Sequence, residues 1–548
     1  MKNKVETGNN LKADNPQAPE KSHDRSVVIG VVWLATLIGA ILRAFFVLHS
    51  DFPLNDGGLF YTMVQDLQAA HFHLPLVTSY NQANIPFAYP PLPFYLAGVL
   101  NSWLHFDLIQ ELRFLPLVFS VMSIPAFYGA AKQLLKTEVQ QLAAVFVFAL
   151  LPETYVWQIM GGGLTRSIAF FFMLLALMYF LKWIQQQRWP DFGLMILFTA
   201  LTALCHLDIL WTLALSYVLI FLLRRRTWKV LAFLALTAIG AALLTSPWWA
   251  TVIAQHGLSP FLQAFHSGNF NLLGPLGSLT GLNPEASLIR KLFSVLAILG
   301  IFWVLRERDG FLPAWWLVIL FFDPRSSLRS ATLPIALLAG ITLAQGLGWI
   351  SRNLTGQKSG KTAEFVERQT PDFTNPWIKG TLAVLIIFCF FNDLVGIYLP
   401  GSLLSSLNEN NREAMQWVKA NTPVSSRFLV IDYPDSWATD RVGEWFPALT
   451  GRVSLLTAQG KEWLPGDALV KVSENLTEVS NCRFADVSCL EDWQKKKGTD
   501  FEYIYFTDDA QTGEAAEQYT SVQEAQMSTD LGYALVYSNG DVRIFRKK

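Results

Sequence analysis

The sequence predicts a polytopic α-helical membrane protein, with about eleven spans in residues 27–400 and a C-terminal extracytoplasmic α/β domain in residues 401–548. Of the 548 residues, 52% are hydrophobic and only 16% are charged, whereas about a quarter of the residues in a soluble domain are charged. The hydrophobic residues form long uncharged runs before Pro400, and the charged residues lie between and after these runs. This pattern is typical of a chain in a lipid bilayer. The net charge of −1 gives no electrostatic argument for a nucleic-acid partner.

Residues 1–26 are expected to form a disordered cytoplasmic tail. The stretch from Met1 to Arg25 is too long and too mixed for the charged start of a cleavable signal peptide. No small-residue cleavage site follows the first apolar run. That run is therefore predicted to be a retained span.

The apolar runs predict the spans, because a helix needs about twenty apolar residues to cross a bilayer. The stretch 192–223 could be one helix or two, and its length favours two. The predicted spans are 27–48, 111–131, 139–157, 166–184, 192–207, 208–223, 229–250, 288–305, 311–322, 330–349 and 378–399.

Lysine and arginine residues predict the orientation, since they gather in cytoplasmic loops. The tail is basic and is placed in the cytoplasm, so counting spans leaves 49–110, 158–165, 251–287 and 323–329 outside. The first three of these segments contain no Lys or Arg. An odd number of spans places the C-terminal domain outside the membrane, on the face opposite the tail.

The segment 90–104 is apolar but short for a span. Counting it as one would move every later basic loop to the outside. It is therefore predicted to be a helix that lies at the outer membrane surface, with proline at its start.

The pattern changes after Pro400. A helix is expected over 411–420, buried strands over 427–432 and 501–506, and a hairpin over 533–545 around an Asn-Gly turn. Cys482 and Cys489 lie close together and could form a disulfide if this domain is outside the cell.

The first outer loop (49–110) carries the most informative motifs. It opens with Asp51-Phe-Pro-Leu-Asn-Asp56-Gly57-Gly58 directly after the first span and continues to Ala88-Tyr89-Pro90-Pro91-Leu92. Arg43 lies within the preceding span, and Glu111-Leu-Arg113-Phe-Leu-Pro116 opens the next one. This arrangement resembles the GT-C class of integral membrane glycosyltransferases, and within it the protein O-mannosyltransferases and lipid A aminoarabinose transferases.

Two departures from that class are visible. The family often has Asp-Glu where this chain has Asp56-Gly57, and the aminoarabinose transferases have Lys before Pro-Pro-Leu, where this chain has Tyr89.

The resemblance implies an enzyme that takes a sugar from a polyprenyl-phosphate carrier at the outer face. Asp56 stands where the class has its catalytic carboxylate, and Glu153 where it often has a second acid. Such a transfer needs a base for the acceptor proton and polar or cationic groups for the departing phosphate. Asp56 could instead be a turn residue, and Glu153 a helix cap.

The candidates for binding the donor phosphate are polar residues near the outer boundary. Arg43 could alternatively snorkel or pair with Asp56, Arg166 could merely follow a flexible turn, and His206 could belong to a satisfied buried pair. Arg325 and Arg329 could instead bind lipid headgroups in general. The full set of phosphate candidates is Arg43, Tyr89, Arg166, His206, Arg325 and Arg329.

No cofactor is indicated. A divalent metal is compatible with the chemistry, but the sequence offers no clear Asp-x-Asp ligand set. Two aromatic-acid clusters in the C-terminal domain, Glu444-Trp445-Phe446-Pro447 and Gly460-Lys461-Glu462-Trp463, could contact sugar or could be part of the domain's own core.

The favoured hypothesis is a multi-pass membrane glycosyltransferase with Asp56 as base. Its acceptor could be a glycan, a lipid or a protein. The rivals are a transporter or flippase, which would show internal repeats and broken helices, and a polysaccharide polymerase or ligase.

Overall fold

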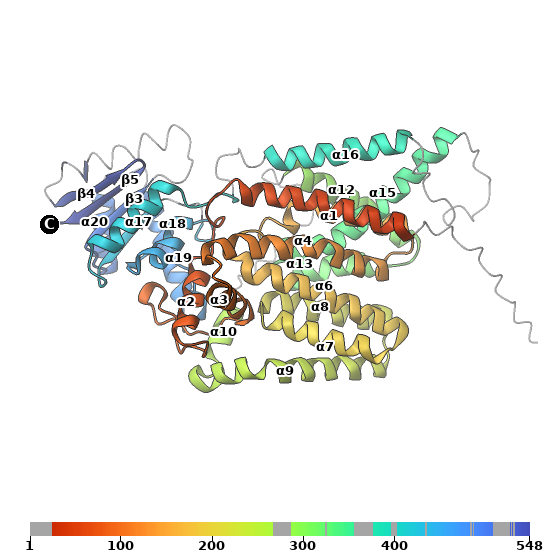
Figure 1. Ribbon diagram of the computed structural model, residues 1–548, viewed down its shortest axis with the longest axis horizontal. Coiled ribbons are helices and arrows are strands. Elements are labelled where there is room, and N and C mark those ends of the chain that lie inside the picture. The colour runs from red at the N-terminus through yellow and green to blue at the C-terminus, as the bar shows by residue number, and fades with distance from the viewer. Residues whose placement is uncertain are drawn as a thin grey trace, which may run out of the picture.

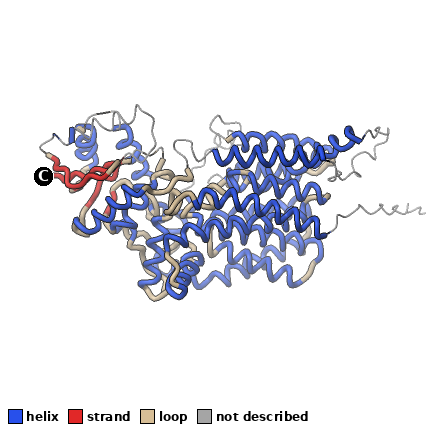
Figure 2. Tube along the Cα trace, turned by 45° about the horizontal axis from the view of Figure 1, so that its top comes forward, coloured by secondary structure: helices blue, strands red, loops and turns tan. Residues whose placement is uncertain are grey.

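A computed structural model shows a long helix bundle with a small mixed sheet at one end (Figures 1 and 2). The structure describes residues 25–266, 287–323, 326–355, 376–395, 403–432, 434, 436–482, 485, 487–507, 526–527, 529 and 532–548. The predicted tail, except its last two residues, and most of the segment between the predicted spans 330–349 and 378–399 lie outside these ranges.

Within the described residues, each predicted span overlaps one helix of the bundle. Seven helices in the described residues are long and apolar enough to cross a membrane, and three shorter apolar helices accompany them. The chain is therefore a multi-pass integral membrane protein, whereas the count of eleven spans stays a prediction. The bundle helices are α1 (Arg25–Leu48), α4 (Leu108–Leu134), α5 (Glu138–Leu150), α6 (Gly163–Gln186), α7 (Trp189–Ala203), α8 (Leu207–Arg224), α9 (Trp228–His256), α12 (Leu288–Arg306), α13 (Phe311–Phe322), α15 (Thr332–Thr355) and α16 (Pro376–Val395).

Two helix boundaries can be compared with the predicted limits of the spans. The predicted span 139–157 is too long, because α5 ends at Leu150 and Pro152 starts a separate turn, η2 (Pro152–Thr154). Proline disfavours the helical conformation of the residue before it, which explains the stop. The stretch 192–223 forms two helices, α7 and α8, as its length indicated.

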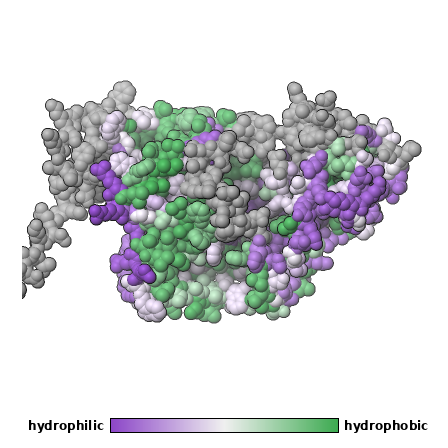
Figure 3. Space-filling view, turned by 180° about the vertical axis from the view of Figure 1, so that it is seen from behind, coloured by the Kyte–Doolittle hydropathy of each residue, from purple (hydrophilic) through white to green (hydrophobic). Residues whose placement is uncertain are grey.

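Loops meet at two opposite ends of the bundle. At one end, ion pairs join Lys136 to Glu307 (2.7 Å) and Arg224 to Asp309 (2.8 Å). The first outer loop and the sheet lie together at the other end (Figure 1). An apolar surface covers the bundle between two hydrophilic ends (Figure 3). Which end faces the cytoplasm stays a prediction.

The first outer loop contains α2 (Gly58–Ala69), η1 (Tyr80–Gln82) and α3 (Leu92–Leu104). Arg113, near the start of α4, donates a hydrogen bond to the Val47 carbonyl at the end of α1 (3.0 Å). The loop thus leaves and re-enters the bundle at the same end, so α3 does not cross the bundle. Two further short helices are α10 (Ser259–His266) and α14 (Ser327–Ser330).

The C-terminal region, meaning the described residues from Leu403 onward, is built on one five-stranded sheet of order β2-β1-β3-β5-β4. β1 is parallel to β2 and β3, and β5 is antiparallel to β3 and β4. Its elements are α17 (Glu409–Asn421), β1 (Arg427–Ile431), α18 (Arg441–Thr450), β2 (Val453–Ser454), η4 (Lys461–Trp463), α19 (Ala468–Asn481), α20 (Ser488–Lys497), β3 (Tyr503–Thr507), β4 (Tyr533–Asn539) and β5 (Val542–Lys547).

The predicted helix, both predicted strands and the hairpin are present in this region. Asn539 pairs with Val542, so the hairpin turn consists of Gly540 and Asp541, one position later than an Asn-Gly turn. Gly540 has a φ of 50°, which suits glycine.

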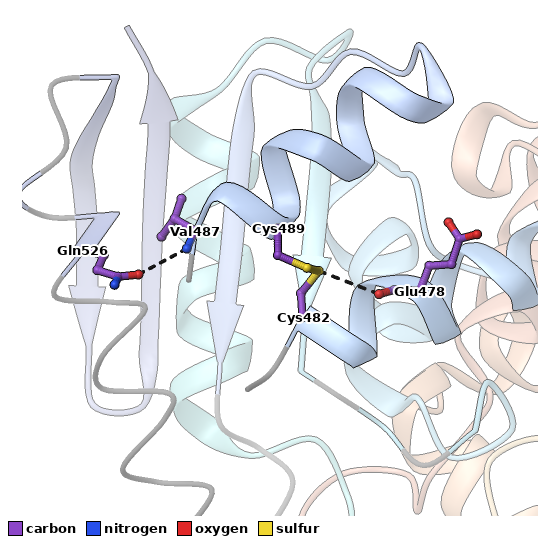
Figure 4. Close-up of a disulfide and its surroundings, with 5 residues drawn as sticks. All are labelled: Glu478, Cys482, Val487, Cys489 and Gln526. Atoms are coloured by element: carbon purple, nitrogen blue, oxygen red, sulfur yellow. Dashed lines mark hydrogen bonds between the residues drawn. A yellow bond between two sulfur atoms is a disulfide. The ribbon is translucent and has the colours of Figure 1, made fainter. Parts of the chain in front are cut away.

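A disulfide joins Cys482, at the end of α19, to Cys489, at the start of α20 (Figure 4). Their Cα atoms are 5.7 Å apart. The bond agrees with the predicted placement of this region outside the cytoplasm, where disulfides persist. Cys205 and Cys389 are buried free thiols.

Candidate active site

Asp56 lies in a tight turn between α1 and α2. The residues on both sides have positive φ, 50° at Asn55 and 125° at Gly57. Asp56 Oδ1 accepts a hydrogen bond from Gly162 N (2.7 Å), and Oδ2 accepts one from Arg166 Nη2 (2.8 Å). The side chain is 16% exposed. The carboxylate is therefore held in place and can still be reached.

A run of three glycines lets the start of α6 approach this carboxylate. A Cβ at Gly162 would lie 2.4 Å from Asp56 Oδ2, and one at Gly161 would lie 2.0 Å from the Asp56 carbonyl oxygen. Larger residues would push Asp56 away. Gly162 is also the N-cap of α6, where the helix dipole favours a negative charge. The glycine run thus forms part of the site.

Arg166 lies in the first turn of α6 and faces Asp56. Its Nε donates to the Trp157 carbonyl (2.9 Å), and its guanidinium lies 5.6 Å from the Trp157 ring centre. Within the described part of the chain, Nη1 has no hydrogen-bond partner, and the side chain is 14% exposed. One donor of Arg166 is therefore available to an anionic ligand.

The structure also shows the contacts of three other predicted residues, Tyr89, His206 and Arg329. The Tyr89 hydroxyl lies 3.4 Å from Thr165 Oγ1, and the Tyr89 ring lies 5.9 Å from the His206 ring. Arg329, on α14, pairs with Asp208 (3.1 Å). The charge of Arg166 acts on Arg329, so the two guanidinium groups share one electrostatic neighbourhood.

Polar groups of α8 and the α13–α14 connection fix Arg329. Its Nη2 also donates to Ser326 Oγ (2.5 Å), and the Ser326 hydroxyl bonds to Asp208. Asp323 accepts from Thr212 Oγ1 (2.6 Å) and from Ser326 N (3.2 Å). Asp208 thus pairs with Arg329 directly, whereas Asp323 bonds to Ser326 and Thr212 beside it.

Arg43 does not belong to this group. It is fully buried, and its guanidinium donates to Ser120 Oγ (3.1 Å), the Ala149 carbonyl (2.7 Å) and Thr154 Oγ1 (3.0 Å). Two of the three expectations for Arg43 are wrong, because it neither snorkels to water nor pairs with Asp56, and its contact with the donor phosphate stays a prediction. Acceptors from α4, α5 and η2 satisfy it inside the bundle.

Glu153 belongs to another ion pair, with Arg290 (3.3 Å). Asp56 is paired with Arg166, so the structure does not join the two predicted acids in one pair. Arg325 lies outside the described residues. Among the residues that are described, no group of three or more His, Cys, Asp or Glu side chains is arranged to hold a metal.

Two residues at the site were not predicted as its members. Gly57 N donates to Glu444 Oε1 (2.8 Å), and Trp445 Nε1 donates to the Asn55 carbonyl (3.1 Å). Burial raises the pKa of Glu444 to about 8, and the neighbouring Asp56 adds to this shift. The aromatic-acid cluster at 444–447 was visible in the sequence. Its location beside Asp56 could not be predicted from the sequence.

The second aromatic-acid cluster also reaches the first outer loop. The Trp463 ring centre lies 5.5 Å from that of Tyr89. A Cβ at Gly460, whose φ is 83°, would lie 2.7 Å from Ile85 Cδ1. The C-terminal region therefore covers the loop at two places.

Comparison with known proteins identifies the fold. No family model matches this chain, and no curated protein matches its sequence. The oligosaccharyltransferase AglB from Archaeoglobus fulgidus, in complex with an inhibitory peptide and a dolichol-phosphate, is similar in structure, with 12% identity over 95% of this chain and 74% of AglB, and a TM-score of 0.58.

ArnT from Cupriavidus metallidurans in its apo state is also similar, with 12% identity over 95% of this chain and 97% of ArnT, and a TM-score of 0.54. ArnT bound to undecaprenyl phosphate gives 11% identity over 95% of this chain and 98% of ArnT, and a TM-score of 0.52. These proteins are GT-C glycosyltransferases, and this chain has the GT-C fold.

Proposed function

We propose that this chain is a membrane glycosyltransferase that moves a sugar from a polyprenyl-phosphate carrier to an acceptor. The reaction takes place at the end of the bundle that carries the first outer loop. The observation that carries the proposal is the Asp56–Arg166 pair, which is 2.8 Å apart and partly exposed, in a chain with the GT-C fold. The ligands of the similar structures, dolichol-phosphate in AglB and undecaprenyl phosphate in ArnT, motivate the choice of donor.

Asp56 acts as the general base in this proposal. It takes the proton of an acceptor hydroxyl while that oxygen attacks the anomeric carbon of the sugar. The bond between sugar and phosphate breaks, and the polyprenyl phosphate leaves with the electron pair. Each oxygen of Asp56 accepts one hydrogen bond from the protein, which leaves further lone pairs for the acceptor.

Arg166 and Arg329 stabilise the departing phosphate. Arg166 keeps Nη1 for a ligand, and its charge already interacts with that of Arg329. Positive charge placed where negative charge develops lowers the barrier to bond breaking. In the aminoarabinose transferases a Lys precedes Pro-Pro-Leu, whereas here Tyr89 offers only a hydroxyl. The two arginines therefore supply the cationic charge.

The test is Asp56→Asn, which keeps the shape of the side chain and removes its basicity. Transfer from a polyprenyl-phosphate sugar should fall by about 10²–10⁴-fold, because a general base contributes that much. Asp467→Asn is a matched control, since Asp467 forms an exposed surface pair with Lys471. Radiolabelled sugar transferred by purified protein in lipid nanodiscs is the measurement.

Transfer at the wild-type rate by well-folded Asp56→Asn protein would contradict the role of Asp56. Movement of a solute across vesicles by the wild-type protein, with no transfer from any lipid-linked donor, would select the transporter instead. Products that grow by repeated addition would identify a polymerase.

A further inference from the structure

One helix of the C-terminal region contacts the chain on both sides of Asp56. The residue before Asp56, Asn55, offers its carbonyl to Trp445 Nε1 at 3.1 Å. The residue after it, Gly57, donates its N–H to Glu444 Oε1 at 2.8 Å. Both partners are adjacent residues of α18, and the closer pair in sequence is 387 residues apart.

The contact is tightly packed. Trp445 is fully buried, with its ring centre 4.6 Å from that of Phe52, and Glu444 is 5% exposed. The Tyr80 hydroxyl donates to the Glu444 carbonyl at 2.6 Å. A Cβ at Gly58 would lie 2.6 Å from that same carbonyl oxygen, so α18 lies directly against the loop backbone. Little freedom remains for the turn that carries Asp56.

We propose that Glu444 and Trp445 are positioning residues of the active site, which hold the backbone on both sides of Asp56 and so aim its carboxylate at Arg166 and the acceptor. The inference rests on the proposed function of Asp56. It makes the C-terminal region part of the catalytic machinery, although no residue of that region needs to touch the substrate.

The choice of a glutamate supports this role over simple adhesion between two parts of the chain. Removing a carboxyl group from water is costly, and an apolar contact of the same size would hold the surfaces together at least as well. The cost is larger here because the charge of Asp56 lies close by. The carboxyl group of Glu444 nevertheless fits one task, which is to accept backbone N–H groups at the start of α2, those of Gly57 and Leu59.

The surroundings of Glu444 also predict a pH dependence. The charged or titratable groups that act on it are Asp56 from the first loop, Arg166 from α6 and Tyr80 from η1, and Tyr80 in turn interacts with Asp440 and Glu462. Burial and the charge of Asp56 raise the pKa of Glu444 to about 8. Above that pH a second negative charge forms beside the base and opposes an anionic donor. Transfer should therefore fall as the pH rises through about 8.

The stability of the fold should change in the same direction. The folded state binds the Glu444 proton more tightly than the unfolded state does, so unfolding releases a proton at intermediate pH. The free energy of unfolding should fall as the pH rises from 4.5, the usual pKa of a glutamate, to about 8, the pKa of Glu444 in the fold. Glu444→Gln, which cannot ionise, should remove this contribution and flatten the alkaline limb of activity.

The experiment compares full-length Glu444→Ala, Glu444→Gln and Trp445→Phe with the wild type, using a polyprenyl-phosphate sugar. Glu444→Ala should lower kcat by about 10–10²-fold and leave KM for the donor near the wild-type value, because a misplaced base slows chemistry rather than binding. Glu444→Gln keeps an acceptor oxygen for Gly57 and should retain most activity at pH 7. The kcat of Trp445→Phe should lie between those of Glu444→Ala and Glu444→Gln. Glu478→Gln is the control, since Glu478 pairs with lysines on the surface.

Amide hydrogen exchange over residues 52–58 provides a readout that does not depend on activity. Exchange at Gly57 should be faster in Glu444→Ala than in the wild type, with melting temperature recorded in parallel. Unchanged exchange at Gly57 overturns the inference, as does a wild-type kcat in folded Glu444→Ala. A wild-type protein that transfers no sugar contradicts the proposed function alone, because the exchange result still decides whether α18 holds the turn.

Discussion

Arg43 and Arg166 lie near the same end of the helix bundle, but their guanidinium groups are held in different ways. Arg43 is fully buried and bonded to neutral oxygens of α1, α4, α5 and η2. Arg166 is partly exposed, pairs with Asp56 and keeps one nitrogen without a partner among the described residues. The difference teaches that burial of a cation in this fold does not by itself indicate a ligand site. An unsatisfied donor beside an exposed carboxylate is the better indicator.

Replacing Arg166 should have the largest effect on transfer within this comparison. Arg166→Gln removes the cation and should lower kcat by about 10²–10³-fold, the usual cost of losing one preorganised donor. The melting temperature should also fall, because Asp56 and the Trp157 carbonyl lose a largely buried donor, so kcat is compared for the folded protein. Arg224→Gln is the matched control, since Arg224 pairs with Asp309 at the opposite end of the bundle. Equal transfer rates for Arg166→Gln and Arg224→Gln would show that Arg166 is not part of the active site.

A methyl group at Gly162 should have an intermediate effect. In Gly162→Ala the new Cβ would lie 2.4 Å from Asp56 Oδ2 and 3.0 Å from Arg166 Nη2, so the pair must shift apart. Transfer should fall by about 10–10²-fold. Gly193→Ala, in α7, places its methyl group in open space and should leave the rate unchanged. The measurement is the steady-state transfer rate of each variant. Similar rates for Gly162→Ala and Gly193→Ala would show that transfer tolerates a displaced Asp56 carboxylate.

Replacing Arg43 should have the smallest effect on the rate and a clear effect on stability. Arg43→Met leaves the Ala149 carbonyl, Ser120 and Thr154 without their donor, at about 1–3 kcal/mol for each buried group that stays unsatisfied. The folded fraction should transfer sugar at nearly the wild-type kcat. Thermal unfolding in nanodiscs, together with kcat for the folded protein, is the measurement. If Arg43→Met lost transfer while keeping wild-type stability, Arg43 would contribute to transfer as Arg166 does.

The helices of this fold were predictable from composition, because a helix that crosses a bilayer must consist mostly of apolar residues. Each apolar run from Val27 to Leu399 became a helix, and the absence of Lys and Arg in 49–110 placed the first loop at the end of the bundle that carries the sheet. The exact end of α5 was not predictable from hydropathy, because Pro152 stops the helix within an apolar stretch. The turns of the C-terminal region followed from local residues such as Gly540.

The candidate site was predictable only in part. Asp56 and Arg166, both predicted as site residues, form an ion pair, and the Tyr89 hydroxyl lies beside Thr165, whereas their roles stay predictions. Arg43 was misjudged, since its partners come from helices whose mutual rotation the sequence does not reveal. Glu444 was missed as a site residue because a contact across 387 residues depends on how the sheet packs against the first loop. Topology thus follows from periodic patterns, whereas side-chain convergence does not.

The separation between Gly57 and Glu444 also has a consequence in time. The turn at Asp56 is synthesised 387 residues before the glutamate that holds it. At about 5–20 residues per second, the ribosome needs about 20 to 80 s to cover that distance. During this interval the turn at Asp56 lacks its contact with α18. Each newly made molecule therefore passes through a stage in which the bundle helices have been synthesised while the turn at Asp56 still lacks its contacts with Glu444 and Trp445.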